Sequence, residues 1–183
     1  MPIEIKRIRP DEWALLRDLR LDSLRDAPDA FGQRLDEAAL FGDEDWKATA
    51  KAASKGDRRT WLIARNGDKP VGLVQGRRRP PDACLLFSMW VAPDARRLGV
   101  GRALVDAVDD WARAWGAKRV ILWVLAGNGG AHRFYEDIGF RVLTSGPDAA
   151  SGSAYGALAM ERVREEGGEA PRPAQESASE DVG

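Results

Sequence analysis

The spacing of apolar residues along the chain predicts an alternation of strands and helices. Short runs rich in Val, Ile, Leu and aromatic residues, bounded by turn-forming residues, are typical of strands. The run "KRVILWVL" is apolar throughout, as expected of a strand buried on both faces. Asn66-Gly67 separates two runs as a hairpin turn does. Strands are predicted at 3–8, 60–66, 70–78, 83–91, 118–125, 140–144 and 154–163.

Apolar residues three and four positions apart predict helices between these strands. We expect them from about 10 to 27, over 43–55, over 99–115 and over 128–138. The third is the clearest, with an apolar face opposite a polar face that holds Arg102, Asp106, Asp109, Asp110 and Arg113. Residues 28–42 are predicted to be irregular, and 145–153, "SGPDAASGS", a flexible loop. This order predicts an α+β or mixed α/β fold.

Composition and charge divide the chain into one domain and a tail. Residues 1–163 can bury one sizeable core. Residues 164–183 are rich in Glu, Pro, Ser and Ala, carry a net charge of −4 and are predicted to be disordered. The rest of the chain then carries about +3 of the total of −1. Because its arginines form small clusters, this charge favours a local anion site over a nucleic-acid surface.

Several classes of protein are disfavoured by what the sequence lacks. No apolar run approaches the roughly 20 residues of a membrane span, so no membrane partner is expected. The start "MPIEIKRIRPDEW" has no apolar core and no cleavage pattern, so we expect no signal peptide. The single cysteine, Cys84, allows no internal disulfide and fits a cytoplasmic protein. With one histidine, His132, it makes a zinc site improbable, and no metal is expected.

The stretch "APDARRLGVGRAL" places two glycines and several arginines at the start of the clearest helix. The first amides of a helix have no internal partners, and its dipole makes that end positive. Glycines let a ligand approach the backbone, so the stretch can hold a phosphate. It lacks the spacing of a P-loop and the third glycine of a dinucleotide fingerprint, since Leu104 stands there. A tight turn with no ligand is the alternative.

Two motifs together resemble the GNAT family of N-acetyltransferases. Arg96-x-x-Gly99-x-Gly101 follows a strand that ends Val91-x-Pro93, as in that family's acetyl-CoA motif. Downstream, "NGGAHRFYEDIGF" has the family's N-x-x-A-x-x-F-Y-x-x-x-G-F spacing. The likeness extends over about residues 2–163. It implies a splayed, mostly antiparallel sheet of six or seven strands flanked by about four helices.

The resemblance also implies where acetyl-CoA, the expected co-substrate, would bind. Backbone groups at 89–91 would hold the pantetheine arm, and amides across 97–102 would hold the pyrophosphate. Asn128 would contact the pantetheine or its thiol end, and Tyr135 would place its hydroxyl near the sulfur. The residues expected to form the site are therefore Met89, Trp90, Val91, Arg96, Arg97, Leu98, Gly99, Val100, Gly101, Arg102, Asn128 and Tyr135.

Acetyl transfer requires a neutral amine, a stabilised carbonyl oxygen and a proton for the leaving thiolate. Tyr135 is the candidate acid, because it shares an inward helical face with Ala131, Phe134 and Ile138. A packed tyrosine without a catalytic role is the alternative. A backbone N–H near Val91 is the candidate oxyanion donor. Asn128 could equally cap its helix, and the two roles are compatible.

The general base is not evident from the sequence. Many family members carry a glutamate on one of the strands that correspond to 83–91 and 118–125, and neither segment here contains a carboxylate. Asp82 lies just outside, and Ser88 and Cys84 are weak candidates. We expect deprotonation through water, or a carboxylate from the N-terminal helices such as Glu37. An acceptor pocket could draw on four aromatic residues, most of which we expect in the core: Phe31, Phe41, Trp46 and Trp90.

These observations favour an N-acetyltransferase that moves an acetyl group from acetyl-CoA to a primary amine of a small molecule or protein in a ternary complex. A non-catalytic acyl-CoA-binding regulator is the alternative. A nucleic-acid-binding module built on Arg77-Arg78-Arg79 is disfavoured, because no aromatic residues interleave with these arginines. The resemblance leaves a homodimer open, and nothing in the sequence identifies the amine.

Overall fold

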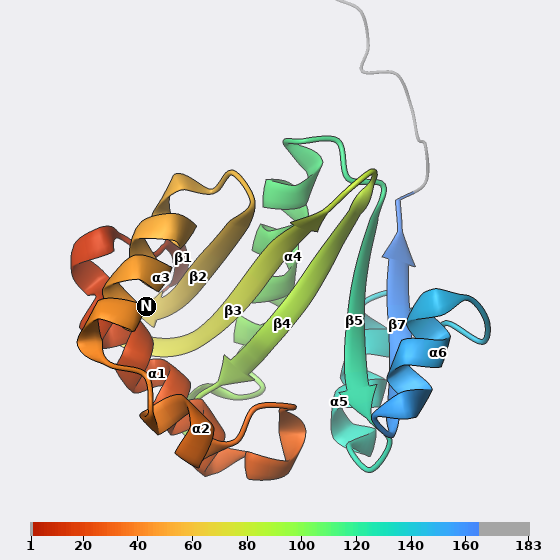
Figure 1. The fold of residues 1–183 in the computed structure, drawn as a ribbon, viewed down its shortest axis with the longest axis horizontal. Coiled ribbons are helices and arrows are strands. Elements are labelled where there is room, and N and C mark those ends of the chain that lie inside the picture. The colour runs from red at the N-terminus through yellow and green to blue at the C-terminus, as the bar shows by residue number, and fades with distance from the viewer. Residues whose placement is uncertain (1, 165–183) are drawn as a thin grey trace, which may run out of the picture.

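The structure, a computed structural model, describes residues 2–164. Its centre is one sheet of seven strands in the order β1-β2-β3-β4-β5-β7-β6 (Figure 1). Each of the seven strands predicted from the sequence is present, with ends within a few residues of the expected ones. They are β1 (Ile3–Arg7), β2 (Arg59–Asn66), β3 (Lys69–Arg79), β4 (Ala83–Val91), β5 (Arg119–Leu125), β6 (Arg141–Val142) and β7 (Ala157–Val163).

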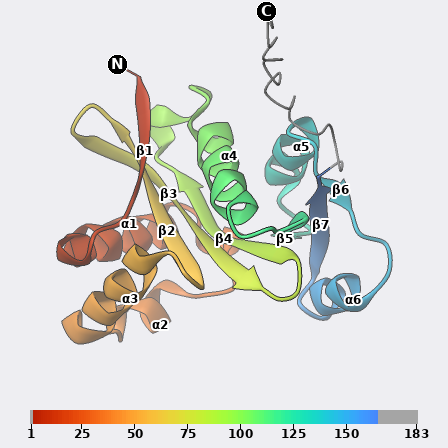
Figure 2. The same ribbon diagram turned by 90° about the horizontal axis from the view of Figure 1, so that it is seen from above.

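Six α-helices cover the two faces of this sheet. Helices α1 to α3 and α6 lie on one face, which we call the front, and α4 and α5 lie on the back (Figure 2). The four expected helices are α1, α3, α4 and α5. The bounds are α1 (Trp13–Asp26), α2 (Leu35–Ala39), α3 (Asp43–Lys55), α4 (Val100–Arg113), α5 (Gly129–Asp137) and α6 (Pro147–Ala154).

Each face has its own hydrophobic core. On the back, the apolar face of α4 packs on alternate residues of the central strands, among them Leu62, Val74 and Val120. On the front, α1 and α3 pack around Trp61, Leu73 and Trp90. Because side chains alternate across a strand, one central strand supplies both cores. The strand residues of the front core come from β2, β3 and β4, whereas α6 contacts Trp123 of β5, so the front helices stand on either side of the gap between β4 and β5.

The sheet is splayed between β4 and β5. These two strands run parallel and pair at only three positions, Ala83 with Arg119, Cys84 with Val120 and Leu85 with Ile121. Beyond this point they diverge, as Figure 1 shows. An irregularity in the β3–β4 ladder lies further along β4, between Phe87 and Trp90, where Ser88 has a left-handed φ of 53°. A β-bulge of this kind bends a strand and turns it away from its neighbour.

Two segments differ from the sequence prediction. The stretch 145–153, predicted to be a flexible loop, contains helix α6, which Pro147 begins in the favoured first position. Asp148 in α6 accepts two hydrogen bonds from Arg79 of β3, at 2.6 and 2.9 Å, and the Asp148 carbonyl accepts one from Trp123. The irregular stretch 28–42 likewise contains the single-turn helix α2.

Asp109 was placed on the polar face of α4, but it is buried beneath the C-terminal end of β7. Arg164 donates to its carboxylate at 2.7 Å, and Arg162 and Arg113 lie within ion-pair distance. Burial alone would raise the pKa of this carboxyl, but the hydrogen bond from Arg164 and the charges of the arginines hold it below its ordinary value. The first residue of the predicted tail is thus tied to the domain, and residues 165–183 lie outside the described part.

Cys84 lies on the back of β4 with no exposed surface, and its burial raises the pKa of the thiol to about 12. Cys84 packs in the back core, and near neutral pH it stays a protonated thiol that cannot accept a proton as a base. Within residues 2–164, no helix has the length and apolar character needed to span a membrane.

Candidate active site

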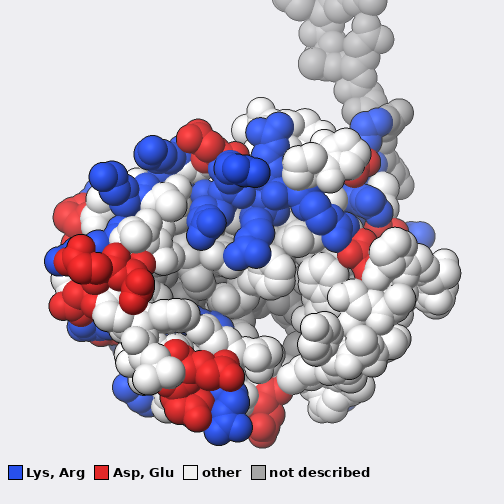
Figure 3. Space-filling view, viewed as in Figure 1, with Lys and Arg blue, Asp and Glu red and all other residues white. Residues whose placement is uncertain are grey.

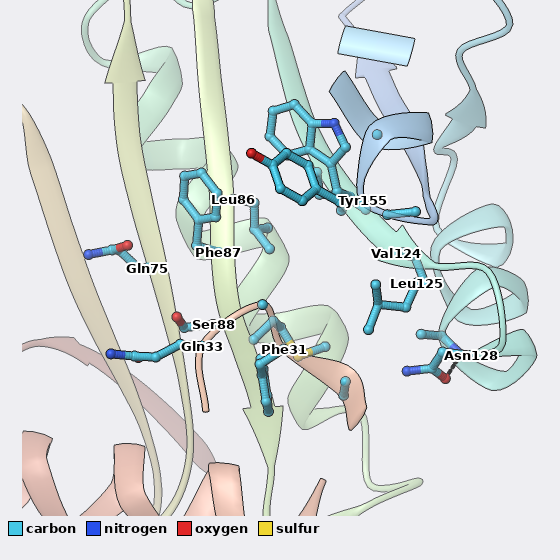
Figure 4. Close-up of a pocket in the computed structure, with 18 of the residues that line it drawn as sticks. Phe31, Gln33, Gln75, Leu86, Phe87, Ser88, Val124, Leu125, Asn128 and Tyr155 are labelled. Atoms are coloured by element: carbon cyan, nitrogen blue, oxygen red, sulfur yellow. Dashed lines mark hydrogen bonds between the residues drawn. The ribbon is translucent and has the colours of Figure 1, made fainter. Parts of the chain in front are cut away.

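A cavity of about 720 Å³ lies on the front of the sheet where β4 and β5 separate. Figure 4 shows Phe87 and Ser88 of β4 on one side and Val124 and Leu125 of β5 on the other. Phe31 and Gln33, from the segment between α1 and α2, close a second side, and Tyr155 at the end of α6 closes a third. The splay of the sheet therefore creates the cavity, and the segments 28–42 and 145–153, predicted to be irregular, contribute to its wall. Tyr155 falls in the strand predicted over 154–163 but lies instead at the C-terminal end of α6.

Tyr135 lies in the wall of this cavity, as expected for a residue that acts on a ligand there. Its ring packs edge-on against Phe134 and Phe140, with centroids 5.0 and 5.4 Å away. No residue in the described part of the chain hydrogen-bonds its hydroxyl, and burial raises the pKa of the phenol. The hydroxyl is therefore a protonated donor with no protein partner. This position of Tyr135 is compatible both with the proposed acid role and with the alternative that the tyrosine only packs.

Asn128 forms the N-cap of α5. Its Oδ1 accepts the backbone N–H of Ala131 at 3.1 Å, the dashed line in Figure 4. This bond fixes the side chain, and its amide nitrogen remains available on the cavity wall. The capping role considered from the sequence is confirmed, and the cap leaves a donor for a ligand.

The glycine turn leaves a row of backbone amides at the start of α4. The first backbone bond of the helix within the described residues runs from Ala103 to the Gly99 carbonyl, so the amides of Val100, Gly101 and Arg102 precede it. Gly99 has a φ of +79°, and a Cβ there would meet no atom within 4 Å. The left-handed conformation and the open space together present these amides to a ligand. Arg97, with a φ of 63°, and the exposed Leu98 complete the turn.

Gly101 has a different reason to be glycine. A Cβ at this position would lie 3.1 Å from the Phe134 ring of α5 and 3.2 Å from the Met89 side chain of β4. The N-terminus of α4 thus packs closely against the helix of Tyr135 and the strand that leads into the turn. The two motifs found in the sequence therefore meet in space.

Arg96 holds this turn to the rest of the domain. Its guanidinium donates to the Val91 carbonyl at 3.0 Å and forms an ion pair with Asp26 at the end of α1. Asp26 also accepts the indole N–H of Trp90 at 2.8 Å. Arg96 and the Trp90 side chain are thus engaged within the protein. Their contribution to a ligand site is to position the turn and the end of β4.

The end of β4 presents backbone groups to the gap. The Ala92 N–H donates to the Val71 carbonyl, and Gly72 pairs with Val91. Because neighbours in an antiparallel ladder point alternately to either side, the N–H and C=O of Val91 face away from β3. Arg96 takes the carbonyl, so the Val91 N–H is the donor that remains on the side of the gap.

The candidate bases from the sequence do not fit the site. Glu37 does not line the cavity, and its carboxylate accepts the Arg34 backbone N–H of its own helix. Asp82 lies at the β3–β4 turn, where the sheet is closed, with its carboxylate 3.6 Å from Arg119. Ser88 does line the cavity. Among the described residues that line it, none is an aspartate or a glutamate.

Of the four aromatic residues considered for an acceptor pocket, Phe31 alone lines the cavity. Trp46 and Trp90 are buried in the front core, and Phe41 packs edge-on against Trp46 at the surface. Seven further polar and aromatic residues of the lining were not predicted from the sequence. No spacing along the chain marks them, because they come from separate elements that meet only in the fold. They are Arg20, Gln33, Gln75, Phe87, Trp123, Ser151 and Tyr155.

Comparison with known proteins decides the family. The model of the GNAT acetyltransferase family matches residues 14–140, more than half of the chain. The chain belongs to the GNAT acetyltransferase family. The expected fold is therefore confirmed. Within residues 2–164, no cluster of His, Cys, Asp or Glu has a composition that could hold a metal ion.

Curated relatives of this GNAT chain match it over part of their length. An uncharacterised N-acetyltransferase of Methanocaldococcus jannaschii is 32% identical over 44% of this chain and 42% of its own. Mycothiol acetyltransferase of Beutenbergia cavernae is 38% identical over 44% and 27%. The Escherichia coli N-acetyltransferase of the alanine of ribosomal protein bS18 is 30% identical over 54% and 66%. The chain thus spans less than two thirds of these relatives.

Solved GNAT structures share the fold at low identity. The PaiA N-acetyltransferase of Thermoplasma acidophilum, solved in complex with coenzyme A, superposes with a TM-score of 0.73 at 15% identity. The match covers 90% of this chain and all of that one. The structure of the Escherichia coli bS18 enzyme gives 0.62 at 20% identity over 92% and 97%. The splayed sheet and its helices are thus common to these proteins.

Proposed function

We propose that this GNAT chain is an acetyl-CoA-dependent N-acetyltransferase that transfers the acetyl group directly to a primary amine in a ternary complex. The observation that carries the proposal is the position of the free amides of α4 beside the cavity that Tyr135, Asn128 and Met89 line. Val91 and residues 96–102 do not line this cavity, but Gly101 packs against Met89 of β4 and against Phe134 of α5, next to Tyr135. A solved relative of the same fold is described in complex with coenzyme A. The reducing cytoplasm is the compartment that suits its lone, buried thiol.

The bound co-substrate would lie along the gap. Its pyrophosphate would accept bonds from the amides of residues 97–102, and its pantetheine would pair with the end of β4 as an additional strand. Helix N-termini bind phosphate because free amides and the helix dipole both favour negative charge. Asn128 would donate to the pantetheine.

In the reaction, the nitrogen lone pair of the neutral amine attacks the thioester carbonyl carbon. The C–N bond forms, and the carbonyl oxygen becomes negatively charged. This oxygen accepts a hydrogen bond from the Val91 backbone N–H. When the carbonyl re-forms, the C–S bond breaks and its electron pair stays on sulfur. Tyr135 supplies a proton to this sulfur, and the amine releases its proton to water. The products are the N-acetylated amine and CoA, and solvent then returns the Tyr135 proton.

Water is the proposed proton acceptor, because no aspartate or glutamate lines the cavity among the described residues. An ordinary alkyl amine has a pKa near 10.4, so it is mostly protonated at pH 7. The amine loses this proton to solvent before it attacks, and water in the cavity takes the proton that is released on attack.

The test is release of free thiol from acetyl-CoA in the presence of a panel of amines. Amine-dependent release with formation of an acetylated amine is the expected result. If CoA binds but no amine in a broad panel, including peptides with free N-termini, accelerates release, the chain is the non-catalytic acyl-CoA binder considered above.

A further inference from the structure

The front part of the cavity is positively charged. Two arginines, Arg20 of α1 and Arg77 of β3, contribute to its lining, which has no aspartate or glutamate among the described residues. Figure 3 shows the molecule hollowed near its centre, with Lys and Arg side chains gathered on the side toward the β3–β4 turn. The cavity and its rim therefore favour a ligand that carries negative charge.

Arg20 is buried, and no aspartate or glutamate among residues 2–164 pairs with it. The residue is 5% exposed, and its guanidinium lies over the Phe31 ring, 4.7 Å from the centroid. Its hydrogen bonds go to Gln33 Oε1, at 3.0 and 3.3 Å, and to Ser23 Oγ at 3.3 Å, all neutral acceptors. Burial lowers the pKa of its guanidinium to about 10. A buried cation without a paired anion is costly, so an anionic group bound beside Arg20 would be stabilised by its charge.

Arg77 is the member of the Arg77–Arg79 run that faces the cavity with its charge uncompensated. Its guanidinium lies 5.3 Å from the centroid of Phe87 on the neighbouring strand. Arg79 is paired with Asp148, and Arg78 stacks on Trp115 of the opposite face. No carboxylate of the described chain forms an ion pair with Arg77. Two guanidinium groups thus reach the same cavity from α1 and from β3.

Beside these arginines is an aromatic wall. The rings of Phe87 and Trp123 are nearly parallel, at 17°, with centroids 6.1 Å apart across the gap between β4 and β5. Tyr155 is 80% exposed and lies at the same mouth, as Figure 4 shows. An exposed aromatic at a cavity mouth offers a flat apolar surface to a ligand.

We propose that the acceptor is a carboxylate-bearing amine with an apolar or aromatic body, such as a hydrophobic α-amino acid. Arg20 and Arg77 bind its carboxylate, and Phe87, Trp123 and Tyr155 hold its body. Guanidinium groups suit this role because their planar donors match a carboxylate. The inference rests on the proposed acetyl transfer, whose bonds are unchanged, because the carboxylate takes no part in them.

The first experiment compares acceptors in matched pairs. Thiol release from acetyl-CoA is measured with the hydrophobic α-amino acids, with their amides and with the corresponding decarboxylated amines. We expect kcat/KM to be at least tenfold higher for the acids. Equal or better rates with the amides or the decarboxylated amines would overturn the inference.

A binding measurement separates this inference from the proposed function. N-acetylphenylalanine and its amide are titrated by calorimetry into the protein saturated with CoA. If no amine is acetylated but the acid binds at least tenfold more tightly than the amide, the function fails and the carboxylate site stands. If neither probe binds, or both bind alike, the carboxylate site is refuted.

The variant Arg77→Gln tests the arginine directly, and Arg78→Gln is its matched control. Loss of a charge-assisted hydrogen bond predicts a KM for the acid raised about tenfold to a hundredfold, with kcat nearly unchanged. The amide should be unaffected, and Arg78→Gln should behave as the wild type. Arg20→Met tests the buried partner. A role for both arginines in folding alone would lower the melting temperature and preserve the acid-to-amide ratio, which would contradict the inference.

Discussion

At the scale of single residues, burial governs the chemistry of Tyr135. A phenol whose pKa is raised stays protonated across the physiological range, so it is always ready to donate. A thiol has a pKa of about 8.5, so full proton transfer from the phenol to a free thiolate is uphill. The proton therefore moves only as the C–S bond breaks and charge builds on sulfur. This argues for a moderate rate contribution.

The variant Tyr135→Phe should lower kcat by about a hundredfold, near the low end for general acid catalysis. The ring keeps its edge-on contacts with Phe134 and Phe140, so KM for acetyl-CoA and the melting temperature should change little. Steady-state kinetics and thermal unfolding of the same variant give both quantities. A kcat within about threefold of the wild type, with acetyl transfer limiting the rate, would exclude Tyr135 from the mechanism.

Motifs can point to candidate residues with fixed spacing along the chain, but not to residues that only the fold brings together. Gly99, Gly101, Asn128 and Tyr135 have fixed spacings along the chain and could be found from it. Arg20 is far from Arg77 in sequence, and their common cavity depends on the splay of the sheet. Glu37 does not line the cavity, and its carboxylate accepts the Arg34 backbone N–H at the start of its own helix. The sequence could not indicate how far this side chain lies from the cavity.

At the scale of elements, strong local patterns were sufficient to predict most helices and strands. Tertiary contacts explain the helix that the local sequence does not predict. Helix α4 and the central strands follow from apolar periodicity alone. Helix α6 contains Gly and Ser, which are poor helix formers, so its sequence predicts a loop. Two tertiary contacts hold it, the Arg79–Asp148 pair and the hydrogen bond from Trp123 to the Asp148 carbonyl. Tertiary context thus overrides local propensity at a wall of the cavity.

Two glycines on either side of α4 form a matched pair for a binding test. Gly99 is the N-cap of the helix, and Gly116 follows its C-terminal end. Both have a positive φ, +79° and +83°, and open space at the Cβ position. Replacement of either by glutamate should therefore cost similar stability, about 1–2 kcal/mol for a strained left-handed residue. Only Gly99→Glu places a carboxylate beside the free amides.

Affinity for CoA, measured by calorimetry, should fall at least tenfold in Gly99→Glu and stay at the wild-type level in Gly116→Glu. The same affinity in both variants would show that the turn does not bind the pyrophosphate. Gly101→Glu is less informative, because its side chain would also collide with Phe134.

At the scale of the whole molecule, an ion pair connects the C-terminal end of β7 to α4. Arg164 donates to the Asp109 carboxylate at 2.7 Å, and its backbone N–H donates to the Lys118 carbonyl at 2.9 Å. The end of β7 is thereby fastened to α4 and to the start of β5. The described fold therefore includes Arg164, the first residue of the predicted tail.

Two truncations should separate this residue from the rest of the predicted tail. A chain that ends after Arg164 should keep its melting temperature, whereas one that ends after Val163 should lose about 1.5–3 kcal/mol, the usual value of a hydrogen bond to a charged group. For a domain of this size, that loss lowers the melting temperature by about 3–12 °C. Equal stability of the two chains would contradict the role of Arg164.

The pH dependence of the loss provides a further check on these truncated chains. Asp109 has a lowered pKa in the folded state, so its pairing stabilises the fold above the ordinary carboxyl pKa of about 3.9. That contribution disappears as the pH falls through the lowered pKa that Asp109 has in the folded state. The stability difference between the two chains should therefore be full at neutral pH and shrink on acidification.

The burial of Cys84 has a practical consequence for every assay described above. Disulfide reagents react with thiolates, and a thiol without exposed surface and with a pKa near 12 offers almost none at pH 8. Because it is the one cysteine in the chain, the native enzyme contributes no background to a colorimetric thiol count. Each mole of chromophore then equals one mole of CoA liberated, even at high enzyme concentration, so slow acceptors can be ranked without a correction for the protein.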